Sequence, residues 1–144
     1  MTRLDHQTCR ARLEVARVGR LATVTADGLP HVVPCCFALV GDRIYSAVDG
    51  KPKSTMALRR LDNIRANPAA SLVVDHYADD WNQLWWVRAD GRCSIVAAAA
   101  ELRASLDALA DKYRQYQLDP PQGPVLGIDV ERLTGWSFAP QASH

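Results

Sequence analysis

Short apolar runs separated by turn sequences dominate the first third of the chain. The stretch 18–25 is rich in Val, Thr and Leu, which predicts a strand, and Asp27-Gly28 predicts a hairpin turn because glycine accepts a positive φ. A second strand over 29–40 contains two prolines, which cannot donate to a ladder, so we expect it to be bent, bulged or at an edge. A third strand covers 43–48. Three strands joined by tight turns predict an antiparallel meander.

Apolar residues at helical spacing predict three helices. Residues 4–16 form the first, which Asp5 can cap, and residues 97–116 form the last. Between them, Ser54 or Thr55 can cap a helix that ends at the following Asn-Pro pair, since the residue before proline avoids the α region.

The rest of the chain adds further strands and no second domain. The expected strands are 71–77, 84–96, 125–130 and 133–138. Asp90-Gly91 lies within the second of these and predicts a bulge or a tight turn. Six or seven antiparallel strands with two or three helices predict a mainly β (α+β) fold, a closed or partly closed barrel, in one domain over 1–144.

The charge balance limits the partners. The formal net charge is +1 and 23% of the residues are charged, so we expect no nucleic acid and no membrane as partner. No apolar run approaches the roughly 20 residues of a membrane span, and the polar N-terminus lacks a signal peptide, so we expect a cytoplasmic location. The 4 cysteines lack zinc-ligand spacing, so no metal site is expected.

Basic and hydroxyl side chains gather where the central helix begins. Lys51, Lys53, Ser54 and Thr55 surround its first turn, and Arg60 lies about one turn inside. A helix N-terminus offers free N–H groups and a partial positive charge, so this cluster predicts a phosphate site. The alternative is that Ser54 only caps the helix and the basic residues form a solvated face.

Three tryptophans form the second candidate feature: Trp81, Trp85 and Trp86. Trp85 and Trp86 point to opposite faces of a strand. One is therefore expected in the core, and the other lines a cavity or a dimer interface, although core packing alone is an alternative for each. No Ser-His-Asp or Cys-His arrangement is present, so we expect no catalytic side chain and a cofactor that supplies the reactivity.

Several short segments carry a resemblance to a known family: 19–34, 44–48, 51–54, 60–68, 71–74 and 135–137. In order and spacing they resemble the pyridoxamine-phosphate-oxidase-like split barrels, which bind flavins. The resemblance spans nearly the whole chain and implies an antiparallel split β-barrel flanked by helices. The tail after Phe138 has no counterpart of the substrate-phosphate arginine of true pyridoxamine phosphate oxidases, which argues against vitamin B6 chemistry.

Four segments resemble one mycobacterial-type branch of that family: 51–53, 58–61, 75–77 and 85–88. The branch is assigned to the deazaflavin coenzyme F420, and the resemblance implies a homodimer with cofactor sites at the subunit interface. It further implies that Tyr45 and Ser46, with the two loop lysines, hold the phosphate, with Arg60 as an added anchor. Val33 and Pro34 would lie beside the ring system.

The expected function is therefore a deazaflavin-dependent oxidoreductase that passes hydride to a small, electron-poor organic acceptor. Two alternatives remain open on the same fold. One is an FMN-dependent oxidase or reductase. The other is a non-catalytic flavin, deazaflavin or haem carrier or sensor.

Overall fold

The computed structural model describes the backbone of residues 1–48 and 55–140, and the side chains of all of these except 55–58. The strands are β1 (Thr2–Arg3), β2 (Gly19–Val24), β3 (Pro30–Cys35), β4 (Ala38–Val40), β5 (Arg43–Ala47), β6 (Ala69–His76), β7 (Trp85–Ile95) and β8 (Val125–Ser137). The helices are α1 (His6–Val15), α2 (Thr55–Ala66), the 3₁₀ turn η1 (Trp81–Gln83), α3 (Ala99–Lys112) and α4 (Arg114–Leu118).

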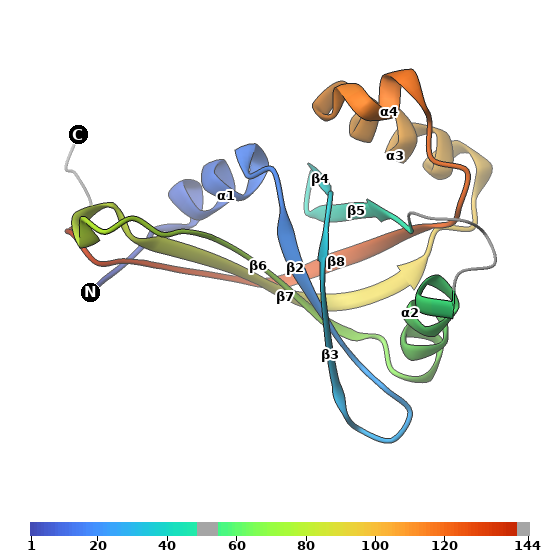
Figure 1. The fold of residues 1–144 in the computed structure, drawn as a ribbon, viewed down its shortest axis with the longest axis horizontal. Coiled ribbons are helices and arrows are strands. Elements are labelled where there is room, and N and C mark those ends of the chain that lie inside the picture. The colour runs from blue at the N-terminus through green and yellow to red at the C-terminus, as the bar shows by residue number, and fades with distance from the viewer. Residues whose placement is uncertain (49–54, 141–144) are drawn as a thin grey trace.

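All strands pair antiparallel in one sheet of 8 strands, in the order β3-β2-β6-β7-β8-β5-β4, with β1 added to β8. The sheet curls, and the long strands β6, β7 and β8 form its spine (Figure 1). β3 and β4 are its two edges although they are neighbours in the chain, so the barrel is split between them. The predicted antiparallel split barrel with helices is thereby confirmed.

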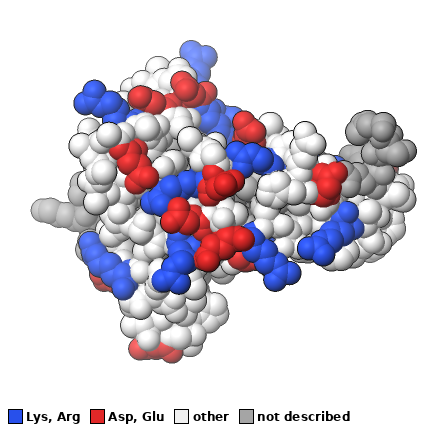
Figure 2. Space-filling view, turned by 180° about the vertical axis from the view of Figure 1, so that it is seen from behind, with Lys and Arg blue, Asp and Glu red and all other residues white. Residues whose placement is uncertain are grey.

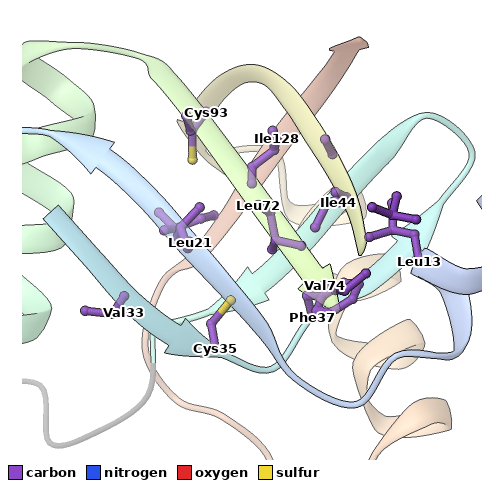
Figure 3. Packing of buried hydrophobic residues seen from close by; sticks show 14 of the residues in the cluster. Leu13, Leu21, Val33, Cys35, Phe37, Ile44, Leu72, Val74, Cys93 and Ile128 are labelled. Atoms are coloured by element: carbon purple, nitrogen blue, oxygen red, sulfur yellow. The ribbon is translucent and has the colours of Figure 1, made fainter. Parts of the chain in front are cut away.

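Two apolar clusters fill the interior. The larger lies within the curl of the sheet and brings together Leu13 of α1, Leu72 of β6 and buried residues of β2, β3, β5, β7 and β8 (Figure 3). The smaller lies beneath α3 and α4, around Tyr45 and Leu109. Helices α1 and α2 pack on the larger cluster, whereas α3 and α4 pack on the smaller one, which lies on the other side of β5 because the successive residues Ile44 and Tyr45 belong to different clusters. On β3, the side facing away from the larger cluster carries the exposed residues Val32 and Pro34.

Local sequence signals act as expected at several positions. Asp5 caps α1, with its Oδ1 accepting from the Thr8 amide at 2.7 Å, and Gly28 takes a φ of 82° in the hairpin turn. The register of β7 against β8 shifts between Asp90 and Gly91, which confirms the predicted bulge. None of the described helices is long and apolar enough to cross a membrane.

Three predicted boundaries were wrong, and long-range packing explains each. The helix expected over 97–116 breaks at Tyr113, whose φ of −119° and ψ of 116° place its ring against the barrel. The strand expected over 29–40 divides into β3 and β4, which pair with different strands. The two runs expected after residue 124 form one strand, β8, because β7 and β5 pair along its length.

Candidate functional site

An aromatic cavity of about 640 Å³ opens at the end of the sheet where β6 turns into β7. Its lining residues are Met1, Arg20, Val73, Asp75, His76, Tyr77, Trp81, Leu84, Trp85, Trp86, Trp136 and Phe138. The chain has 4 tryptophans, and all of them belong to this set. We call this space the aromatic cavity.

Strand register builds the floor of this cavity. Trp86 of β7 lies directly opposite Trp136 of β8 and opposite Asp75 of β6. Side chains on paired residues of neighbouring strands share one face of the sheet, so the indoles of Trp86 and Trp136 are side by side. The turn η1 adds Trp81, whose ring meets that of Phe138 edge-on at 5.8 Å.

Both predicted tryptophans line the cavity, and neither is fully buried. Trp85 also packs against the larger apolar cluster, as expected for the inward-facing member of the pair. The guanidinium of Arg12 lies 4.9 Å from the centre of the Trp85 ring, and that of Arg88 lies 5.8 Å from the Trp86 ring. Cations thus flank the indoles at the edge of the cavity.

The polar content of the cavity is small. Arg20 donates to Asp75 at 3.0 Å, and both side chains are about half exposed. The remaining walls are mostly aromatic or aliphatic. Such a surface suits a planar ligand held by stacking.

None of the 4 cysteines, all of which lie in the described part of the chain, lines the aromatic cavity. Cys9, Cys35 and Cys93 are buried, and burial raises the pKa of the Cys93 thiol to about 12. A thiol with so high a pKa is not ionised near neutrality and is inert. No described group of His, Cys, Asp or Glu side chains could hold a metal ion.

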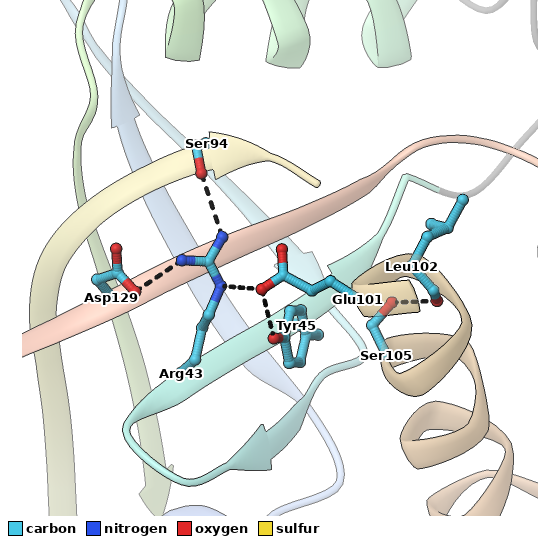
Figure 4. A network of polar contacts seen from close by, with 7 residues as sticks. All are labelled: Arg43, Tyr45, Ser94, Glu101, Leu102, Ser105 and Asp129. Atoms are coloured by element: carbon cyan, nitrogen blue, oxygen red, sulfur yellow. Dashed lines mark hydrogen bonds and ion pairs between the residues drawn. The ribbon is translucent and has the colours of Figure 1, made fainter. Parts of the chain in front are cut away.

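The structure places the predicted phosphate ligand Tyr45 beneath α3, where it is 7% exposed. Its hydroxyl donates to Glu101 at 3.1 Å, and Glu101 also pairs with Arg43 at 3.4 Å (Figure 4). Arg43 in turn bonds Asp129 at 2.7 Å and Ser94 at 3.2 Å. Burial and the bond to Glu101 raise the pKa of Tyr45. The Tyr45 hydroxyl therefore joins β5 to α3.

The other predicted ligands on β3 and β5 divide between the two sides of the sheet. Ser46 is 1% exposed and donates to the Cys36 carbonyl at 2.7 Å. Val33 is buried in the larger cluster, whereas Pro34 is exposed opposite Arg20 of β2. Only Pro34 of these presents its side chain on the outer face, and Val33 and Ser46 could reach a ligand through their backbone alone.

The predicted basic cluster is described only in part. Lys51, Lys53 and Ser54 lie outside the described residues, and Thr55 is the first residue of α2. The Nε of Arg60 is buried with no hydrogen-bond partner among the described residues. Arg60 lies in the middle of α2, and a buried guanidinium nitrogen with no described partner fits an anion that supplies the missing acceptor.

The two groups of predicted residues lie far apart within one chain. Tyr45 pairs with Gly127 and Trp86 pairs with Trp136, nine residues further along β8. At about 3.4 Å per residue, the separation is about 30 Å. α2 and η1 likewise lie toward opposite ends of the molecule (Figure 1).

The sequence profile of the family described as pyridoxamine 5'-phosphate oxidase matches residues 6–137. The chain belongs to this family. The match spans every main element from α1 to β8, and the split barrel is the fold of the family. No curated protein sequence matches the chain.

Solved structures of other family-like proteins share the fold. An FAD-binding protein from Mesorhizobium loti has a TM-score of 0.71 at 24% identity, over 93% of this chain and 95% of that one. A conserved hypothetical protein from Mycobacterium tuberculosis has a TM-score of 0.74 at 21% identity, over 98% and 92%. A heme binding protein from Mycobacterium smegmatis has a TM-score of 0.74 at 20% identity, over 94% and 55%.

Sequence reasoning missed part of the aromatic cavity. Tyr77, Trp136 and Phe138 contribute to it, as do Met1 and Arg20. The signal that could have found Trp136 was its position near the end of the last strand, because antiparallel pairing of β8 with β7 places that end beside Trp86. The sequence alone does not show that β8 pairs with β7, so this position could not be used as a signal.

Proposed function

We propose that this family member is a homodimeric oxidoreductase that binds the deazaflavin coenzyme F420 and serves transfer of hydride to a small, electron-poor organic acceptor. The observation that carries the proposal is the aromatic cavity, which gathers all 4 tryptophans of the chain. Its volume of about 640 Å³ lies within the range of small-molecule and cofactor sites.

The aromatic cavity suits the ring system of such a cofactor. Trp86 and Trp136 offer adjacent indole surfaces, and Trp81 with Phe138 forms a wall across the opening. When bound, the deazaflavin supplies the hydride chemistry. The protein's own contribution is to orient the ring, exclude water from its faces and hold the acceptor against it.

The start of α2 suits the anionic tail. Lys51, Lys53, Ser54 and Thr55 cluster in sequence at this point, and the buried Nε of Arg60 has no hydrogen-bond partner among the described residues. The deazaflavin coenzyme carries a phosphodiester and several glutamates, so a spread of basic residues complements it better than one compact site would. We expect Pro34 to lie beside the ring, since it is exposed on the outer face.

The separation of these two regions supports the dimer. Within one chain the aromatic cavity and β5 lie up to about 30 Å apart along β8, so a cofactor much shorter than this would not span from the cavity to β5. A second copy packed on the outer face of the sheet would bring its own cavity to the first copy's α2. Each cofactor would then be shared between protomers.

A second candidate is an FMN-dependent enzyme or a non-catalytic carrier on the same fold. It is favoured by the described lining of the cavity, which offers stacking surfaces and one ion pair rather than an activated nucleophile. The similar FAD-binding and heme binding proteins support a range of planar cofactors.

The decisive experiment titrates the purified protein with FMN and with the deazaflavin coenzyme side by side, in wild type and in the double variant Lys51→Ala, Lys53→Ala. Charge-assisted contacts are each worth roughly 1.5–3 kcal/mol when shielded, so the double variant should bind the deazaflavin about one to three orders of magnitude more weakly. The loss should be greater at low salt, where screening is weakest. Equal binding by both proteins at low ionic strength would contradict the site assignment.

Two further measurements separate the alternatives. Tighter binding of FMN, or purification as a yellow protein, would favour the FMN reading. Binding without hydride transfer to any member of an acceptor panel would favour the carrier. Light scattering should give a dimer of the 15.9 kDa chain, and a stable monomer would defeat the shared-cofactor arrangement.

A further inference from the structure

A second cavity lies next to the aromatic cavity, on the other side of Trp85. It has a volume of about 410 Å³ and is lined by Arg12, His76, Asn82, Gln83, Leu84, Trp85, Ser137, Ala139 and Pro140. It shares only His76, Leu84 and Trp85 with the aromatic cavity. We call it the Arg12 pocket.

The charge of the Arg12 pocket is positive. Its described lining includes Arg12 and no Asp or Glu. Among the described residues Arg12 makes no ion pair, and its Nη1 is buried with no hydrogen-bond partner. Arg10, on the same helix, instead pairs with Asp42 at 3.4 Å. A buried donor without an acceptor is costly, so a bound oxyanion would complete the site.

The walls of the Arg12 pocket also favour a flat ligand. The guanidinium of Arg12 is held 4.9 Å from the centre of the Trp85 indole, and the His76 ring is stacked with that indole at 6.4 Å and 23°. Leu84 and Pro140 supply further apolar surface. Stacking on an indole fixes the guanidinium plane, which prepares its fork for a carboxylate.

We propose that the Arg12 pocket binds a small aromatic carboxylate. The carboxylate accepts from the Arg12 guanidinium, and the ring packs among Leu84, Trp85 and Pro140. The side-chain amide of Gln83, exposed on η1, lies at the rim as an additional donor. The site is separate from the proposed cofactor position, because Trp85 forms the wall between the two spaces.

The test is a titration of the full chain with benzoate, followed by the indole N–H signals in ¹H–¹⁵N NMR spectra. The Trp85 signal is assigned from its loss in Trp85→Phe. Wild type should bind benzoate with a Kd of about 1 mM or tighter, with the Trp85 signal shifting most. Arg12→Gln should weaken binding by about ten- to a hundredfold, the worth of a charge-assisted hydrogen bond.

Matched controls make the result specific. Arg10→Gln carries the same change on the same helix and should alter the benzoate Kd by less than about twofold, because Arg10 lines a different cavity. Arg12→Lys keeps the charge but loses the planar fork, and should fall between wild type and Arg12→Gln. Neutral benzamide and non-planar cyclohexanecarboxylate should both bind more weakly than benzoate. A thermal melt of each variant confirms that α1 remains docked.

The cofactor-free titration would overturn the proposal if it gave no benzoate binding to wild type at about 10 mM, equal affinity in folded Arg12→Gln, or benzamide binding as tightly as benzoate. The titration is repeated with the protein saturated in FMN or deazaflavin. Unchanged benzoate affinity supports two separate sites, whereas competition would place benzoate in the aromatic cavity and overturn the assignment. Failure of the cofactor proposal leaves the cofactor-free titration unaffected, so the two hypotheses fail separately.

Discussion

The two ends of the molecule treat aromatic side chains in opposite ways. At the corner beneath α3, Phe37 is fully buried and the Tyr113 hydroxyl contacts Phe37 N at 3.1 Å, Phe37 O at 3.0 Å and Arg17 O at 3.0 Å. At the aromatic cavity, Trp81 is 54% exposed and Tyr77 is 67% exposed. The chain buries the Phe37 ring completely, yet it leaves the large rings of Tyr77 and Trp81 exposed to water at the aromatic cavity. Such clustered exposed apolar surface is typical of a binding surface.

Polar groups show the same contrast. In the α3 region, Arg43 reaches Asp129, Glu101 and Ser94 at once, and Tyr45 completes the network (Figure 4). On the reverse face, Lys, Arg, Asp and Glu are interspersed with one another (Figure 2). At the aromatic end, Arg12 is left without an acceptor among the described residues. The Arg43 network joins β5, β7 and β8 to α3, whereas the guanidinium of Arg12 is available to a ligand.

The largest expected effect separates a buried ring from an exposed one. Phe37→Ala removes a side chain of 0% exposure and should lower the free energy of unfolding by about 3–5 kcal/mol. Trp81→Ala should change it by within about 0.5 kcal/mol, yet weaken cofactor binding by about three- to tenfold through lost stacking. Urea unfolding and cofactor titration of both variants measure these two effects. An equal loss of unfolding free energy in Trp81→Ala and Phe37→Ala would contradict the predicted difference between the two rings.

The next effect concerns the hydroxyl groups of two tyrosines. Tyr113→Phe leaves the buried Phe37 amide without its acceptor, which should cost about 1–3 kcal/mol of unfolding free energy. Tyr77→Phe, made at an exposed ring, should stay within about 0.5 kcal/mol. Chemical denaturation of the pair measures the difference, and equal values would show that the Tyr113 contacts contribute nothing net.

A smaller effect depends on pH. Burial, together with nearby Arg17, lowers the pKa of Lys112 from 10.5 to about 8, and its Nζ lies 3.9 Å from the centre of the Phe37 ring with no described hydrogen-bond partner. At this site the unfolded chain therefore binds more protons between about pH 8 and 10.5, so Lys112 contributes stability that rises with pH across this window, while the raised pKa of Cys93 acts in the opposite direction above about pH 9.

Lys112→Met should remove that rise and stabilise the protein at pH 7 by about 1 kcal/mol, a value reduced because the side chain is partly solvated. Unfolding midpoints measured from pH 7 to 10.5 provide the readout. Arg103→Gln, on the exposed face of α3, is the control and should keep the wild-type slope. Equal slopes in wild type and Lys112→Met would show that the charged amine is not destabilising.

The smallest effect is expected for the exposed ion pair at the aromatic cavity. Arg20 and Asp75 are 47% and 50% exposed, so their coupling in a double-mutant cycle with Arg20→Gln and Asp75→Asn should be below about 1 kcal/mol. Thermal unfolding of wild type, both single variants and the double variant at low salt measures this coupling energy. A coupling of several kcal/mol would contradict the interpretation of this ion pair as a solvent-exposed one of little energetic weight.

Prediction from sequence succeeded where a signal acts within a few residues. Asp5 capped its helix, Gly28 adopted the turn conformation, and the bulge at Asp90-Gly91 occurred where the strand pattern changed. The motif order also placed the chain in its family. The site was predicted less completely, because Trp85 and Trp86 were recognised but their partner Trp136 was not.

Tyr45 shows why the remainder needed the structure. Its place near the end of a strand was compatible with a phosphate ligand, yet α3 supplies Glu101 to its hydroxyl. No local pattern reports which helix will cover a strand. The break at Tyr113 has the same origin, since the helical spacing continues through it while contacts with Phe37 and Arg17 favour an extended backbone there.

The sequence by itself therefore determined most of the strand-forming segments, the Gly28 turn and the Asp5 cap, because alternation, glycine φ and capping act through neighbouring backbone atoms. Tertiary structure alone decided which strands pair, and hence that all 4 tryptophans line one cavity while Tyr45 is enclosed. The physical reason is that strand register and helix docking are set by burial summed over residues distant in the chain. These distant residues bury one another only after the strands have paired into the complete sheet.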